Sequence, residues 1–204
     1  MLPTWLSAVN GWIAAGAGLI GTIAGAAGTW FQMRLKLARA TRDLRQLKDD
    51  AEARRAGRVR AARKNAARLE TFAHRCEALV VENERVKRSR TEREDGLTFH
   101  LPSLTGFNMT GDDTTSLKLE SAYRDLQRDI TAAQNHVDET CRDWHAAGHE
   151  EGLEVVHYNA WRLGDNALKL AERYRNQFEV PRATPAPRTL TAEQTIRERA
   201  AEDA

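Results

Sequence analysis

Residues 5–31 have the sequence WLSAVNGWIAAGAGLIGTIAGAAGTWF, which contains no Asp, Glu, Lys or Arg. A helix needs about 20 predominantly apolar residues to cross the ~30 Å hydrocarbon core of a bilayer. A secretory signal peptide would have a basic start and a shorter apolar run, whereas residues 1–4 carry no basic side chain. The pattern therefore predicts a retained transmembrane helix over residues 5–31, with residues 1–4 as a short N-terminus outside the membrane.

Two tryptophans and the basic residues after the stretch predict how this helix is placed. Trp12 and Trp30 are separated by about 27 Å along a helix, and indole rings favour the two headgroup levels of a bilayer. Arg34, Lys36 and Arg39 are the first charged side chains after the stretch. Excess positive charge stays on the cytoplasmic side. We therefore expect a single-pass inner-membrane protein, of bacterial or phage origin, with its N-terminus outside and its C-terminus in the cytoplasm.

Small residues form a seam along the predicted span. They alternate at steps of three and four, as on one face of a helix: Gly11, Ala14, Gly18, Gly21, Gly25 and Gly28. Lipid tails give apolar helices no hydrophobic reason to pair, so association relies on close backbone approach along small residues. The seam favours self-association, and a chance pattern in a span rich in Gly and Ala is the alternative.

The rest of the chain predicts helices of a different kind. Residues 34–68 hold thirteen Lys or Arg against four Asp or Glu, and residues 32–58 predict a basic juxtamembrane stalk helix in which Gly57 is the weakest point. Leu37, Ala40, Leu44, Leu47 and Ala51 keep a seven-residue rhythm along it. A helix that is polar over most of its surface extends through solvent or is held by ion pairs.

Apolar stripes with helical spacing follow in residues 59–180. They predict helices at about 59–94, 115–147 and 152–178, with a loop at 95–114 and a cap for the second helix among Thr114, Thr115 and Ser116. The prolines of residues 181–204 predict a flexible C-terminal tail in which only a short, marginal helix could form. The fold class that we expect is all-α: a transmembrane helix, a stalk, an antiparallel three-helix cytoplasmic bundle and this tail.

One row of side chains has the chemistry of a metal site. Cys141, His145 and His149 are spaced four residues apart, and thiolate and imidazole groups at such spacing can bind zinc. However, Cys141 also lies on the apolar stripe of its helix, where a small thiol packs well, and Gly148 interrupts the row. We therefore expect neither a metal nor a cofactor, and these three residues remain weak candidates.

A second pattern involves the same region. Arg142-Asp143, followed by His149, resembles the Arg-x(4–6)-His signature of the HEPN ribonucleases, which are helical bundles. The resemblance implies that the arginine and the histidine together support attack of a ribose hydroxyl. Comparable spacings occur at Arg68/His74 and Arg93/His100, as expected by chance for a sequence rich in arginine. No catalytic residue is assigned on this basis.

These patterns lead to one expected function and two alternatives. The basic run at residues 54–64 contains no aromatic side chain for base stacking, so we do not expect a nucleic-acid partner. We expect a non-enzymatic, membrane-anchored interaction or scaffold protein whose partners are membrane lipids, further copies of itself and an unidentified cytoplasmic protein. The alternative is a membrane-perturbing effector similar to holins or toxins, and a HEPN-like ribonuclease is a distant one.

Overall fold

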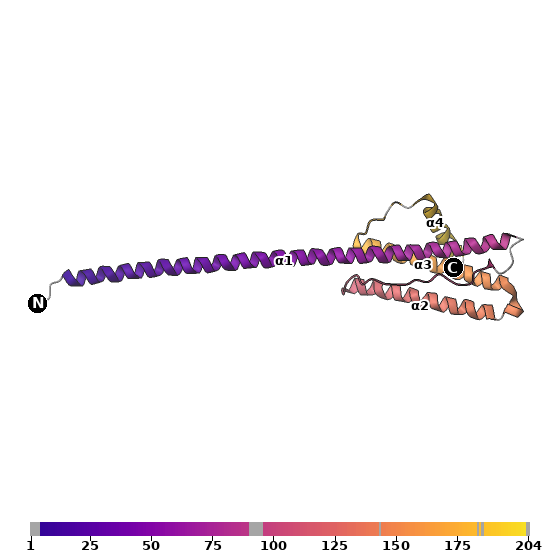
Figure 1. Ribbon diagram of the computed structural model, residues 1–204, viewed down its shortest axis with the longest axis horizontal. Helices are drawn as coiled ribbons and strands as arrows, with labels where there is room; N and C mark the ends of the chain where they lie inside the picture. Colours follow the sequence, from indigo (N-terminus) through magenta and orange to yellow (C-terminus); the bar gives the residue numbers. More distant parts are fainter. Residues whose placement is uncertain (1–4, 90–95, 143, 183, 185, 203–204) are drawn as a thin grey trace. The chain divides into compact units, whose positions relative to one another are not determined.

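The computed structural model describes residues 5–89, 96–142, 144–182, 184 and 186–202, and it describes side chains at residues 30, 32–89, 96–142, 150–182, 184 and 186–202. The regular structure in these residues is all helical, which confirms the predicted all-α class. Four helices follow one another (Figure 1): α1 (Trp5–Arg88), α2 (Thr114–Arg142), α3 (Trp144–Phe178) and α4 (Pro187–Glu202). The chain divides into two compact units, Met1–Arg54 and Arg55–Ala204.

The first unit contains α1 as far as Arg54. Its described side chains, at residue 30 and residues 32–54, are all exposed. Among the helices with described side chains, none has a stretch that is both long and apolar enough to cross a membrane. Within the predicted span at residues 5–31, only the side chain of Trp30 is described. Trp12 and all six residues of the seam, from Gly11 to Gly28, therefore lie outside the described side chains.

The second unit is a helical bundle with one apolar core. The side chains that form it recur at steps of three and four, which places them on one face of each helix. From α1 they are Ala62, Ala66, Leu69, Phe72, Ala73, Cys76 and Val80; from α2, Leu119, Tyr123, Leu126, Ile130, Ala133 and Val137; from α3, Val156, Ala160, Leu163, Ala167, Leu170 and Tyr174. Removal of this apolar area from water is the main favourable term in folding.

The helices of the bundle do not all alternate in direction. Residues 96–113 return along α1, so that α2 begins where Arg58 of α1 pairs with Asp113 at 3.6 Å. Hence α2 runs parallel to the neighbouring part of α1. α3 then runs back, because Lys87 pairs with Glu150 at one end and Glu70 with Arg175 towards the other. The antiparallel arrangement that we expected therefore holds for α3 against its two neighbours but is wrong for α1 and α2.

The helix ends differ from the predicted ones. α1 ends at Arg88 rather than near residue 94, and α2 ends at Arg142 rather than near residue 147. The N-cap of α2 is Asp113, whose carboxylate accepts the backbone N–H groups of Thr115 and Ser116 at 3.1 and 3.0 Å. The hydrogen bond from the Ser116 amide is the largest cause that lowers the pKa of this carboxyl. α3 begins at Trp144 rather than near residue 152, since the ~1 kcal/mol cost of a glycine does not stop a helix that is packed against neighbours.

The C-terminal residues were expected to form a flexible tail, but α4 packs on the bundle. Ile196 is fully buried, and Glu193 is exposed by only 5%. Glu193 pairs with Arg182, and its Oε1 lies 3.3 Å from Nε2 of His74 on α1. A short polar helix is marginal in isolation, and α4 is ordered because tertiary contacts that the local sequence does not reveal hold it on the bundle.

Candidate functional site

The returning segment, residues 96–113, is held against α1 by two buried asparagines. Asn83 donates from Nδ2 to the carbonyl oxygen of Thr98 at 2.8 Å and accepts the Thr98 N–H at 2.9 Å. Asn65 makes the same pair of bonds with the backbone of Asn108, at 2.8 and 3.0 Å. Each amide side chain therefore acts as a short piece of β-ladder, which satisfies backbone groups that would otherwise be unpaired.

Side chains of α2 hold the other edge of this segment. Gln134 accepts the Leu101 N–H at 2.7 Å, and Gln127 donates to the Leu104 carbonyl oxygen at 2.9 Å. The Tyr123 hydroxyl donates to the carbonyl oxygen of Gly106 at 2.7 Å. The segment is thus fixed between two helices, and it forms one wall of a surface hollow.

This hollow, which we call the Arg68 hollow, lies between α1 and the returning segment and has a volume of about 280 Å³. Its polar lining consists of two arginines and three hydroxyl groups: Arg68, Arg75, Thr71, Ser103 and Thr105. Nη1 of Arg68 is buried and has no hydrogen-bond partner. A Cβ atom added to Gly106, at φ +74°, would lie 3.1 Å from Cζ of Arg68, so glycine allows the segment to pass close to the guanidinium.

Two guanidinium groups give the Arg68 hollow its chemical character. Guanidinium groups bind carboxylates and phosphates through planar, paired donors, and a buried donor without a partner, such as Nη1 of Arg68, costs free energy. Elsewhere in the bundle the partner is present: Arg175 donates from Nε and Nη2 to the two oxygens of Glu70, both at 2.8 Å. The two arginines and three hydroxyl groups that line the Arg68 hollow have the chemistry to bind an anionic group.

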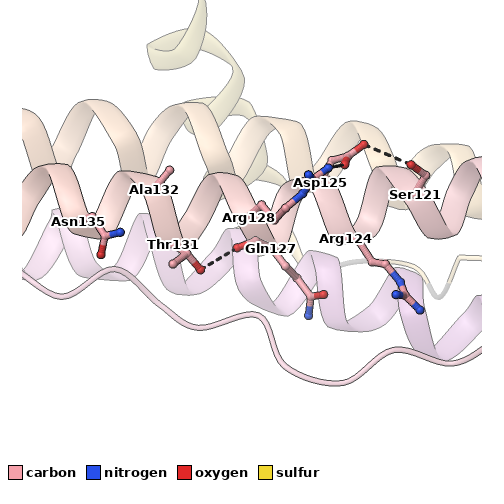
Figure 2. Close-up of a pocket in the computed structure, with 8 residues that line it drawn as sticks. All are labelled: Ser121, Arg124, Asp125, Gln127, Arg128, Thr131, Ala132 and Asn135. Carbon is pink, nitrogen blue, oxygen red and sulfur yellow. Dashed lines mark hydrogen bonds and ion pairs between the residues drawn. The ribbon is translucent and has the colours of Figure 1, made fainter.

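A larger hollow on α2 is a weaker candidate. It has a volume of about 660 Å³, and all the residues that line it come from one helix: Ser121, Arg124, Asp125, Gln127, Arg128, Thr131, Ala132 and Asn135. Figure 2 shows these side chains spread along the outer face of α2. Arg128 pairs with Asp125 and Arg124 pairs with Glu120. Since one convex helix face cannot enclose a ligand and both cations have carboxylate partners, we assign no function to this hollow.

Burial shifts the pKa of two further side chains, the buried Cys76 and the half-buried His157. Burial raises the pKa of the Cys76 thiol to about 12, which makes this cysteine a packing residue rather than a nucleophile. Burial also lowers the pKa of His157, against a smaller upward effect of Glu84, and Nε2 of His157 is buried without a partner.

The predicted site residues are placed as follows. Arg34, Lys36 and Arg39 are exposed on α1, and the Arg34 guanidinium carbon lies 4.3 Å from the centroid of the Trp30 ring, a cation–π contact. Cys141 is half-buried at the edge of the core, where burial raises the pKa of its thiol. The side chains of His145 and His149 lie outside the described residues, so the predicted row is not brought together by any described contact. In the part of the chain with described side chains, no group of three or more potential metal ligands is found.

Sequence reasoning did not single out Asn65 and Asn83, nor Arg68 as part of a hollow. The asparagines share the helix face of the buried α1 stripe, and a polar amide on such a face is a signal that a partner must approach it. For Arg68 the only signal was its position three residues after Asn65, on the edge of the same face.

Comparisons with models of protein families, with curated proteins and with solved structures found no match to this chain.

Proposed function

We propose that this protein is a single-pass, membrane-anchored helical scaffold that associates with further copies of itself and presents its bundle to a cytoplasmic protein. The charge-free residues 5–31 carry this proposal, because a stretch of this length without charge suits a bilayer core. The contact between Arg34 and Trp30 supports it further. An indole at the headgroup level has an apolar side and a polar side, and a cation on its polar side fits that position.

The orientation of the anchor can be tested with the full-length chain. A reporter fused after Ala204 should be active when it is of the cytoplasmic kind and inactive when it is of the periplasmic kind. The opposite result would contradict the proposed topology. The triple variant Arg34→Gln, Lys36→Gln, Arg39→Gln should weaken this preference, since positive charge next to the span sets the orientation.

The seam in the anchor can be tested by enlarging its residues. Gly18→Ile with Gly25→Ile should reduce chemical crosslinking of the detergent-solubilised protein, because β-branched side chains keep the backbones apart. Gly16→Ile with Ala27→Ile makes a comparable enlargement away from the seam and is the matched control. Equal crosslinking of both variants would show that the seam has no role in association.

The Arg68 hollow is the place where the scaffold receives an acidic side chain of its partner. The presence of both Arg68 and Arg75 in the lining of this hollow supports this assignment. In a pull-down with the full-length protein, Arg68→Met with Arg75→Met should lose a protein that the wild type retains. Arg63→Met with Arg60→Met, two exposed positions on α1, should retain it. A partner that the first variant also retains would contradict the assignment.

Induced expression with a membrane-potential dye distinguishes the scaffold from a lesion-forming effector. A scaffold leaves the membrane potential and growth unchanged. Rapid depolarisation after induction would instead favour the effector similar to holins or toxins.

A further inference from the structure

One face of α1 in the first unit is apolar and exposed. Its members follow steps of three and four residues, and we call them the exposed stripe: Trp30, Met33, Leu37, Ala40, Leu44, Leu47 and Ala51. Leu44 and Leu47 are exposed by 66% and 65%, and Met33 by 64%. Alternating steps of three and four over three heptads are the pattern by which helices pair in coiled coils.

We propose that a second copy of this chain covers the exposed stripe, so that residues 30–51 of the two copies form a parallel, in-register coiled coil. The inference rests on the proposed function in one respect, since three heptads are short for a coiled coil. An anchor in a common membrane gives the copies the same direction and a high effective concentration.

Charges beside the exposed stripe are complementary in the parallel arrangement. In a parallel pair, the residue before Leu37 or before Leu44 approaches the residue five positions later on the other helix, as heptad positions g and e do. Asp43 of each copy therefore meets Lys48 of the other, and Lys36 meets the uncharged Thr41. Within one chain Lys48 lies 4.0 Å from Glu52, and both side chains are well exposed. Such a pair contributes little, so it does not prevent the contact with the second copy.

An antiparallel pair with Leu37 of one copy opposite Ala40 of the other would also bring Lys36 near Asp43. The charges beside the exposed stripe therefore do not decide the direction of pairing. The direction follows from the anchor, because two copies inserted in one membrane with the same orientation present residues 30–51 in the same direction.

The exposed stripe and the Gly/Ala seam are separate surfaces. Gly28, the last residue of the seam, precedes Trp30 by two positions, which is about 200° around a continuous helix. The stripe therefore faces nearly away from the seam, so the copy that covers the exposed stripe is a different copy from the one that packs on the seam. This separation allows the two contacts to be tested independently.

Cysteine crosslinking of the full-length protein in isolated membranes tests the pairing. A disulfide requires Cα atoms within about 7 Å, which a stripe position meets in a parallel, in-register pair. Leu44→Cys should give at least several-fold more disulfide-linked dimer than Arg45→Cys, which lies beside both the exposed stripe and the line along which α1 continues the seam. The wild type gives the background from its own cysteines, Cys76 and Cys141. Equal dimer yields from the two variants would overturn the proposal.

A charge exchange tests the direction of pairing. In the Leu44→Cys protein, Asp43→Lys should reduce the dimer yield several-fold, and the further change Lys48→Asp should restore it because the pair is rebuilt with reversed charges. Failure to restore would overturn the parallel register. If the protein is found outside the membrane but still crosslinks at residue 44, the proposed membrane anchor is wrong and pairing through the exposed stripe stands. If the protein stays in the membrane but does not crosslink at residue 44, the proposed pairing is wrong and the anchor stands.

Discussion

Asn65 and Asn83 lie on the same face of α1, about five helical turns apart, and each binds both polar groups of one backbone residue in the returning segment. Both side chains are almost completely buried, at 0% and 1% exposure. Because they hold the two ends of the segment, they fix the path that makes α2 parallel to α1 and that closes the Arg68 hollow.

Removal of either amide should therefore destabilise the bundle. Asn65→Ala or Asn83→Ala leaves a backbone N–H and C=O without partners, and we expect a loss of about 2–3 kcal/mol in the free energy of unfolding. For a domain of this size the midpoint of thermal unfolding falls by at least about 4 °C. Asn135→Ala, at an exposed position of α2, is the control. Losses no larger than that of the control would contradict the role of the two asparagines.

Replacement of Glu179, at the end of α3, by glycine should stabilise the bundle. Glu179 has φ +51°, and the Val180 N–H donates to the Arg175 carbonyl oxygen at 2.9 Å, which is the hydrogen bond of a Schellman motif. A side chain in this left-handed conformation costs about 1 kcal/mol. The exposed pair of Glu179 and Arg55, at 3.4 Å, contributes little. Glu179→Gly should thus raise the unfolding midpoint by about 2–4 °C, and Glu179→Ala should give no such gain. A lower midpoint for Glu179→Gly would argue against the motif.

His157 should make the stability of the bundle depend on pH. Burial holds its pKa below that of the unfolded chain, which is about 6.5, so the unfolded state takes up the proton first as the pH falls. The free energy of unfolding then declines below about pH 6.5, by no more than about 1.4 kcal/mol per pH unit, until the folded pKa is reached. His157→Gln should remove this decline. The test is the difference between wild type and variant at pH 7.5 and 5.5, and an identical loss in both proteins would refute it.

The docking of α4 depends on one apolar side chain. Ile196 is fully buried, and its Cγ2 would contact a Cβ added at Gly164 of α3 at 3.4 Å. Ile196→Ala should cost about 2–4 kcal/mol of local stability. Hydrogen exchange should then accelerate over residues 187–202 and stay unchanged in α2. Leu190→Ala, at a position exposed by 51%, should have little effect. Unaltered exchange in the Ile196 variant would mean that α4 is held by its ion pairs instead.

The predictable part of the fold is the part that periodicity determines. The stripe from Ala62 to Val80 and the stripe from Leu119 to Val137 were predicted from spacing alone, because a helix that must bury one face repeats apolar residues at steps of three and four. The same spacing does not indicate whether neighbouring helices run parallel or antiparallel. The parallel placement of α2 depends on contacts such as Asn83 with Thr98, which are distant in sequence and polar.

The remaining differences have the same origin. α4 is polar enough to be marginal alone, and it is held by the buried Ile196 next to Gly164 of α3 and by the contacts of Glu193 with Arg182 and His74. Arg68 is unremarkable in the sequence, and it becomes a candidate site only because Gly106 passes close to its guanidinium. Both features depend on tertiary contacts that bring distant segments together, and no local pattern reports such contacts.

Alkaline carbonate extraction of membranes from cells that express the full-length chain measures the anchor itself. A helix inserted in the bilayer resists this treatment, whereas a peripheral protein is released. We predict that the full-length protein stays in the pellet and that a variant lacking residues 5–31 is found in the supernatant. Recovery of the full-length protein in the supernatant would contradict the membrane-anchored scaffold.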